Sequence, residues 1–180
     1  MIEFTGERVI PGQVDPDLWA EHVSRYAFAA RFASGARVLD LGCGAGYGTA
    51  ELAGRARSAM GIDLAPEAIA HARSAYPLAN LSFVPASVSA VPFRGGSFDL
   101  VTAFEVIEHL DNWRVLLSEG RRLLHPHGVF LVSTPNRNTI PTRAAPRDRI
   151  HSIHTNLNLK NSAACWPSSF RIARFCCKTI

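Results

Sequence analysis

The segment that most constrains the fold is a short apolar run that leads directly into a glycine-rich turn. Residues 37–41 read Arg-Val-Leu-Asp-Leu and have the aliphatic content of a buried strand. The turn that follows, residues 42–48, carries glycine at every second position, and residues 50–56 have a helical pattern. A strand, a glycine turn and a helix in this order indicate the first β-turn-α unit of an α/β sheet.

The rest of the chain repeats this alternation of strand and helix. Strands are predicted at residues 59–64, 81–86, 98–104 and 129–133, and helices at residues 15–33, 66–75 and 112–124. Because near-continuous apolar strands alternate with helices, we expect an α/β fold, a Rossmann-like three-layer sandwich with a mostly parallel sheet. Residues 1–137 are assigned to one domain, with an N-terminal helix at 15–33 and a core at 36–136.

Glycines and a carboxylate follow the first two predicted strands, at the sheet edge where ligands bind in folds of this kind. Gly42, Gly44 and Gly46 let the backbone turn tightly and approach a ligand that a Cβ atom would block. Asp63, at the end of the second strand, can accept hydrogen bonds from both hydroxyls of a ribose. These residues predict an adenosine-containing cofactor. A nicotinamide dinucleotide is disfavoured, because its fingerprint requires a third glycine where this chain has Tyr47.

Four blocks of sequence follow one another along the predicted core. They are VLDLGCGAGYGTAELA (38–53), GIDLAPEAIAHAR (61–73), VPFRGGSFDLVTAFEVIEHL (91–110) and LLHPHGVFLVSTPN (123–136). In this order the blocks resemble class I S-adenosylmethionine-dependent methyltransferases, in the small-molecule subgroup with bacterial glycan- and ubiquinone-type relatives. The resemblance implies that S-adenosyl-L-methionine is the cofactor and that the reaction is methyl transfer.

The resemblance also implies roles for individual residues. Those expected to contact the cofactor are Asp40, Gly42, Gly44 and Gly46 around its methionine part, Asp63 on the ribose, Leu64 on the adenine, and Phe104 and Glu105 near the transferred methyl. Where many relatives have an Asp near the adenine amino group, this chain has Ser87, so we expect the Val88 backbone to make that contact. Asp40 has an alternative role, in which its carboxylate accepts hydrogen bonds from local backbone N–H groups.

The segment from Glu105 to His109 carries the candidate catalytic residues. If it starts a helix, Glu105, Glu108 and His109 lie about one turn apart. Such a cluster is similar to the divalent-metal site of ubiquinone-pathway O-methyltransferases and small-RNA 2′-O-methyltransferases, so these three residues are candidate metal ligands. In the alternative without a metal, Glu105 contacts the cofactor, Glu108 is solvated, and His109 caps a helix or acts as the general base for an acceptor hydroxyl.

The composition changes abruptly near residue 138. The chain has 180 residues and a net charge of +4, but residues 1–137 carry a net −2 and residues 138–180 a net +6. The tail is either a basic extension or the product of a reading-frame error. We favour the frameshift, because permitted codons from Asn138 onward can encode, in a shifted frame, the helix-like pattern EFEEFRRLLAEFF. Residues 138–180 are then a disordered or out-of-frame tail, the C-terminal hairpin strands are missing, and this chain is expected to be weakly active or inactive.

The expected function is transfer of a methyl group to an oxygen of a small-molecule or glycan acceptor, without a nucleic-acid partner. Two alternatives remain, namely an RNA 2′-O-methyltransferase and a module that binds the cofactor without catalysis. Because no apolar run is long enough to span a membrane and the N-terminal residues lack an export signal, a cytoplasmic protein is expected. The sequence specifies neither the acceptor nor the oligomeric state.

Overall fold

The computed structural model describes residues 9–135 and 170–176. The helices are α1 (Pro16–Ala29), α2 (Tyr47–Ala53), α3 (Pro66–Ala75) and α4 (Trp113–Leu123), with short 3-10 turns η1 (Ala30–Phe32) and η2 (Ile107–His109). The strands are β1 (Arg37–Leu41), β2 (Ser58–Asp63), β3 (Leu81–Pro85), β4 (Phe98–Phe104), β5 (Leu124–Pro135) and β6 (Phe170–Cys176). None of the helices in these ranges is long and apolar enough to cross a bilayer.

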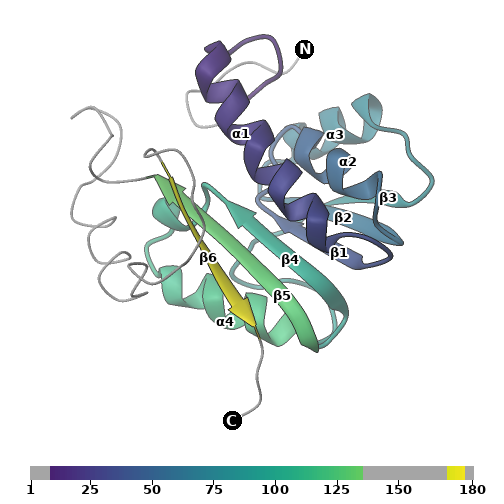
Figure 1. Cartoon of the computed structure of the whole chain (residues 1–180), viewed down its shortest axis with the longest axis vertical. Coiled ribbons are helices and arrows are strands. Elements are labelled where there is room, and N and C mark those ends of the chain that lie inside the picture. The colour runs from purple at the N-terminus through teal and green to yellow at the C-terminus, as the bar shows by residue number, and fades with distance from the viewer. Residues whose placement is uncertain (1–8, 136–169, 177–180) are drawn as a thin grey trace.

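The strands form one sheet in the order β3-β2-β1-β4-β5-β6 (Figure 1). Strands β1 to β5 are parallel to their neighbours, which confirms the predicted Rossmann-like sheet. The chain order reverses between β1 and β4, and the crevice beyond the carboxyl ends of such a pair is where α/β sheets bind ligands. This topology places the glycine turn after β1 beside the segment after β4.

Helices cover both faces of the sheet (Figure 1). On one face, Val38 of β1 and Leu100 of β4 pack with α1 and α2, while on the other Leu39 and Val101 pack with α4. Successive residues of a strand point to opposite faces, so continuous apolar strands are those buried on both sides. The three layers predicted from the sequence are confirmed.

Several element boundaries differ from the predicted ones by a few residues, among them the starts of α2 and β5. Helix α2 begins at Tyr47 and not at residue 50, because Gly46 has a left-handed φ of 87° and completes the turn immediately before the helix. Strand β5 begins at Leu124, directly after α4, where the predicted strand begins at residue 129. Leu124 pairs with Phe98 of β4, and the register shifts before Leu100 pairs with Val129.

The C-terminal segment needs one correction. We expected the sheet to lack the strands that follow the fifth, but β6 pairs antiparallel with β5, from Val129 opposite Cys176 to Pro135 opposite Phe170. Antiparallel closure of a parallel sheet at its edge is common in mixed sheets. Residues 136–169 and 177–180 lie outside the described residues, so the frameshifted origin of residues 138–180 stays a proposal.

Candidate active site

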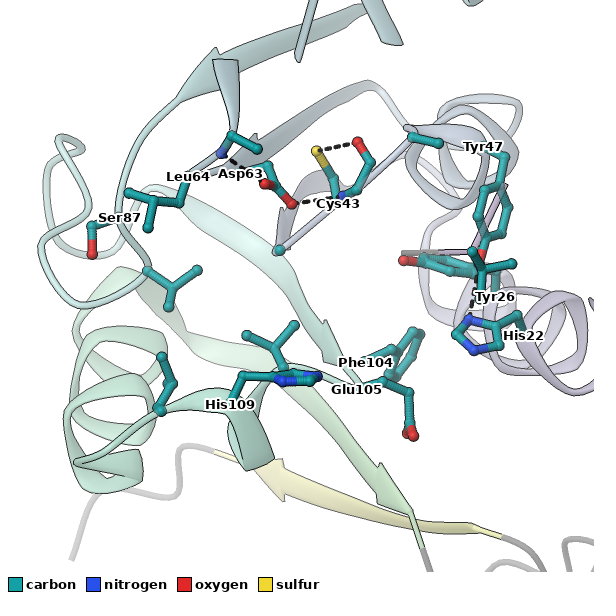
Figure 2. A pocket seen from close by; sticks show the side chains of 18 residues that line it. His22, Tyr26, Cys43, Tyr47, Asp63, Leu64, Ser87, Phe104, Glu105 and His109 are labelled. Atoms are coloured by element: carbon teal, nitrogen blue, oxygen red, sulfur yellow. Dashed lines mark hydrogen bonds between the residues drawn. The ribbon is translucent and has the colours of Figure 1, made fainter. Parts of the chain in front are cut away.

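A cavity of about 500 Å³ lies beyond the carboxyl ends of β1, β2 and β4 (Figure 2). The predicted site residues that line it are Gly42, Gly44, Asp63, Leu64, Ser87, Val88, Phe104, Glu105 and His109. Three predicted residues, Asp40, Gly46 and Glu108, do not line it. The topology therefore gathers at one cavity residues that the sequence places in four separate segments.

The glycine turn lies against the segment after β4. Gly42 and Gly44 have φ values of 75° and 53°, a backbone region that side chains with a Cβ rarely adopt. A Cβ atom on Gly42 would collide with the side chain of Val106. The N–H groups of Gly42 and Cys43 both donate to the carbonyl of Ile62, at 2.8 and 2.9 Å, which fixes the turn to the end of β2. This part of the cavity wall is therefore bare, rigid backbone.

Asp63 is held at the cavity by two backbone hydrogen bonds. The Gly44 N–H donates to its Oδ2 and the Ala65 N–H to its Oδ1, both at 2.9 Å. Each carboxylate oxygen accepts one of these bonds and has capacity for a second. Asp63 can therefore accept two vicinal hydroxyls while its orientation is fixed from behind, as the sequence predicts for a ribose.

The residue that follows Asp63, Leu64, presents an exposed aliphatic surface next to the carboxylate. Leu64 is 75% exposed although it is a large aliphatic residue. Figure 2 shows Leu64 and Ser87 on the same side of the cavity, next to Asp63. The Ser87 hydroxyl accepts a bond from the Ser89 N–H at 3.2 Å. An exposed leucine beside a carboxylate fits the predicted contact with the face of an adenine.

Asp40 has a different role from both predicted ones. Its carboxylate is fully buried behind the turn and accepts hydrogen bonds from three hydroxyls, those of Thr49 (2.7 Å), Thr102 (2.7 Å) and Tyr26 (3.2 Å). These donors belong to α2, β4 and α1, so Asp40 joins three elements beneath the cavity. Burial raises the pKa of Asp40 to about 6, although the three hydroxyls oppose that shift.

The raised pKa of Asp40 gives a pH dependence of stability opposite to that of most carboxylates. The folded state binds a proton near pH 6 and the unfolded state only near pH 4, so this group stabilises the fold at low pH and loses that contribution as pH rises. Between pH 7 and pH 5 the free energy of unfolding of wild type should rise, relative to Asp40→Asn, by about 1 kcal/mol. Urea unfolding of both proteins at several pH values measures this difference in the free energy of unfolding. If the free energies of the two proteins changed equally with pH, the prediction would be contradicted.

Gly46 packs against neighbouring elements and does not line the cavity. A Cβ atom there would lie 2.6 Å from the Cβ of Ala72 and 2.9 Å from the ring of Phe83. The turn therefore packs against α3 and β3 at a point where only hydrogen fits. The close approach of the turn to the helix is sufficient to require glycine at this third position.

Glu105 occupies a strained position immediately after β4. Its φ of 56° is the only positive value at a non-glycine residue in the described ranges. Its N–H donates to the carbonyl of Ser133 at 3.2 Å, and its Oε1 accepts from the Ser133 hydroxyl at 2.7 Å. The Nε of buried Arg25 lies 3.6 Å from the same carboxylate oxygen. Burial raises the pKa of Glu105, opposed by Arg25 and Ser133. Strain of this kind is found at functional sites where surrounding contacts hold it.

The predicted metal cluster is not formed, which corrects that expectation. Residues 107–109 form a 3-10 turn rather than the start of a helix. Glu108 is buried and does not line the cavity, and this burial raises its pKa. His109, by contrast, is exposed and lines the cavity. Glu108 is therefore not solvated either. In the described part of the chain, no group of three or more His, Cys, Asp or Glu side chains is placed to hold a metal ion.

His22 and Tyr47 are among several cavity residues that were not predicted as site residues from the sequence. His22 projects from α1, and its Nδ1 lies 3.0 Å from the hydroxyl of Tyr47, the first residue of α2. The Tyr47 ring packs against Trp19 and Tyr26, with ring centroids 4.7 and 5.6 Å apart. The spacing of Trp19, His22 and Tyr26 on one face of α1 is a signal that sequence reasoning could have used.

Comparisons with known proteins agree with this architecture. The family described as "Methyltransferase domain" matches residues 39–132, more than half of the chain. A "Probable S-adenosylmethionine-dependent methyltransferase" of Mycolicibacterium smegmatis is 39% identical over 157 residues, covering 86% of this chain and 60% of that protein. A ubiquinone biosynthesis O-methyltransferase of Azorhizobium caulinodans is 32% identical over 123 residues, covering 67% of this chain and 49% of that protein.

A solved structure supports the fold independently. A SAM-dependent methyltransferase from Aquifex aeolicus superposes with a TM-score of 0.67 at 15% identity, covering 89% of this chain and 92% of that one. This chain spans at most 60% of the length of the curated relatives named above. The family match, the parallel sheet and the glycine turn with Asp63 lead to one assignment: the chain belongs to the class I S-adenosylmethionine-dependent methyltransferases.

Proposed function

We propose that this protein transfers a methyl group from S-adenosylmethionine to a hydroxyl oxygen of a small-molecule or glycan acceptor. The observation that carries the proposal is the pair of backbone bonds from Gly44 and Ala65 that holds Asp63 at the cavity. A carboxylate fixed in this way, next to exposed Leu64 and the bare backbone of Gly42, fits an adenosine better than a pyrophosphate. The O-methyltransferase named among the relatives supports an oxygen acceptor.

The residues present fit S-adenosylmethionine along the length of the cavity. Leu64 would contact the adenine, Asp63 would accept the ribose hydroxyls, and the turn from Gly42 to Gly44 would lie against the methionine part. The bound cofactor supplies a methyl group that its positive sulfur has already activated. The chain then has to align the acceptor, and such positioning accounts for up to roughly 7–11 kcal/mol of a barrier. Phe104 and Glu105, at the end of β4, line the region between the turn and His109.

His109 is the proposed general base for the acceptor hydroxyl. Its imidazole is exposed, lines the cavity and stands at the end of η2 (Figure 2). Replacement by Asn should lower kcat by about a hundredfold, within the range for general-base residues, and leave the affinity for S-adenosylmethionine unchanged. His127, which is exposed within β5, provides the matched control, because His127→Asn removes an imidazole away from the cavity. Equal rates for the two variants would remove His109 from the mechanism.

Calorimetric titration with S-adenosylmethionine and with NAD tests the cofactor assignment. We expect micromolar binding of S-adenosylmethionine and none of NAD, and the reverse result would refute the proposed function. Transfer of a radiolabelled methyl group to a panel of phenols, polyols and glycans then tests the acceptor class. Binding of the cofactor without transfer to any of them would fit either a non-catalytic module or a catalytic domain made inactive by an out-of-frame tail at residues 138–180. Transfer to RNA alone would refute the proposed small-molecule or glycan acceptor.

A further inference from the structure

The cavity has two ends of different chemistry. Asp63, Leu64 and Ser87 lie at one end, and His22 and Tyr47 lie at the other, with Phe104, Glu105 and His109 between them (Figure 2). The first end has the carboxylate and the aliphatic platform expected for an adenosine. The second end has two aromatic side chains with polar tips, and the cofactor contacts described above do not use them.

The two polar tips at this second end lie within hydrogen-bond distance of each other. The Tyr47 hydroxyl lies 3.0 Å from the His22 Nδ1. Burial raises the pKa of Tyr47, and burial together with the Arg25 charge lowers the pKa of His22 to about 3, so both groups are neutral at physiological pH. In the described residues no other hydrogen-bond partner of the Tyr47 hydroxyl is seen, and a phenol is a good donor. We therefore assign the hydroxyl as the donor to Nδ1, which places the ring proton on Nε2.

The Tyr47 ring is itself held in place, so this arrangement is rigid. Trp19 and Tyr26 pack on it from α1, with centroids 4.7 and 5.6 Å away. The Tyr26 hydroxyl is tied in turn to Asp40 at 3.2 Å. A ring nitrogen fixed from behind by such a network acts as an oriented donor, in the way that outer-shell bonds fix the tautomer of a functional histidine.

From this geometry we propose that the Nε2–H of His22 donates a hydrogen bond to a second oxygen of the methyl acceptor, one that neighbours the oxygen to be methylated. The inference rests on the proposed function and narrows its substrate class to hydroxy compounds with an adjacent oxygen, such as diols. His22 is a specificity residue here and not the base, since Tyr47 already occupies its Nδ1 lone pair. In Figure 2 it lies across the cavity from His109, so the two imidazoles can contact different oxygens of one acceptor.

Paired alcohols test the proposal without the natural acceptor. The protein is loaded with S-adenosylhomocysteine and titrated with cyclohexanol or cis-cyclohexane-1,2-diol, and with phenol or 2-(hydroxymethyl)phenol. We expect the two-oxygen member of at least one pair to bind about fivefold to tenfold more tightly, the effect of one neutral hydrogen bond. His22→Leu should abolish this preference, whereas His22→Gln, whose amide still donates, should retain most of it. Tyr47→Phe should reduce it, because the ring loses the donor that fixes its tautomer.

The outcomes separate this inference from the proposed function. Absence of S-adenosylhomocysteine binding to the wild type refutes both. Normal cofactor binding with no preference in either pair, or with a preference that survives in His22→Leu, refutes the role of His22 alone. A loss of cofactor affinity in His22→Leu that His22→Gln restores would place the donor on the cofactor and also overturn the inference. Thermal unfolding of each variant verifies that it is folded under the titration conditions.

Discussion

Replacement of Asp63 by Asn should weaken the binding of S-adenosylmethionine by about a hundredfold. The carboxylate accepts N–H bonds from Gly44 and Ala65 and has one further site on each oxygen for the ribose hydroxyls. The amide keeps the shape but places an NH₂ where one of these N–H groups donates, so a donor faces a donor. Loss of two charge-assisted bonds costs about 3 kcal/mol, which is about a hundredfold in affinity. Calorimetric titration of both proteins measures the change.

A matched substitution controls for the altered charge. Glu51→Gln removes one negative charge from the exposed surface of α2, and Glu51 does not line the cavity. Its affinity for S-adenosylmethionine should equal that of the wild type. If Asp63→Asn and Glu51→Gln bound the cofactor alike, within about threefold, Asp63 would not be the ribose ligand. A large loss in both would instead indicate a long-range electrostatic effect, which higher salt would reduce.

Replacement of Gly46 by Ala should lower the free energy of unfolding by roughly 3 kcal/mol. Two effects add at this residue, because the backbone has a φ of 87° and a Cβ atom would lie 2.6 Å from that of Ala72. The left-handed conformation costs about 1–2 kcal/mol for a residue with a Cβ, and overpacking typically costs another 1–3 kcal/mol. For a domain of this size the melting temperature should fall by roughly 10 °C. Urea and thermal unfolding measure both quantities.

A second glycine separates the two effects. Gly35 has a φ of 66°, but a Cβ atom there would meet nothing within 4 Å. Gly35→Ala should therefore cost only the conformational part, about 1–2 kcal/mol. The difference between the two variants gives the cost of the contact with Ala72 and Phe83. Equal losses would show that the turn and α3 can move apart, and that Gly46 is required only for its backbone conformation.

The sequence determined the parts of this protein that depend on neighbours along the chain. Apolar strands, the glycine turn and the position of Asp63 directly after β2 are local patterns, and the structure places Asp63 at the cavity as predicted. Helix α3 has the predicted bounds, because Pro66 starts it and the apolar spacing runs to its end. Glycines at positive φ are also visible in a sequence, since few other residues adopt that backbone region.

Only the tertiary structure decided which side chains are buried and which meet across elements. Asp40 and Glu108 look like site residues in the sequence, yet both side chains are buried and neither lines the cavity. His22 lines the same cavity from α1, although it precedes Gly42 by 20 residues in the sequence. Its contact with Tyr47 cannot be predicted from the spacing of the two residues. The physical reason is that backbone preference is local, whereas burial, pKa and hydrogen-bond partners depend on contacts between segments far apart in the chain.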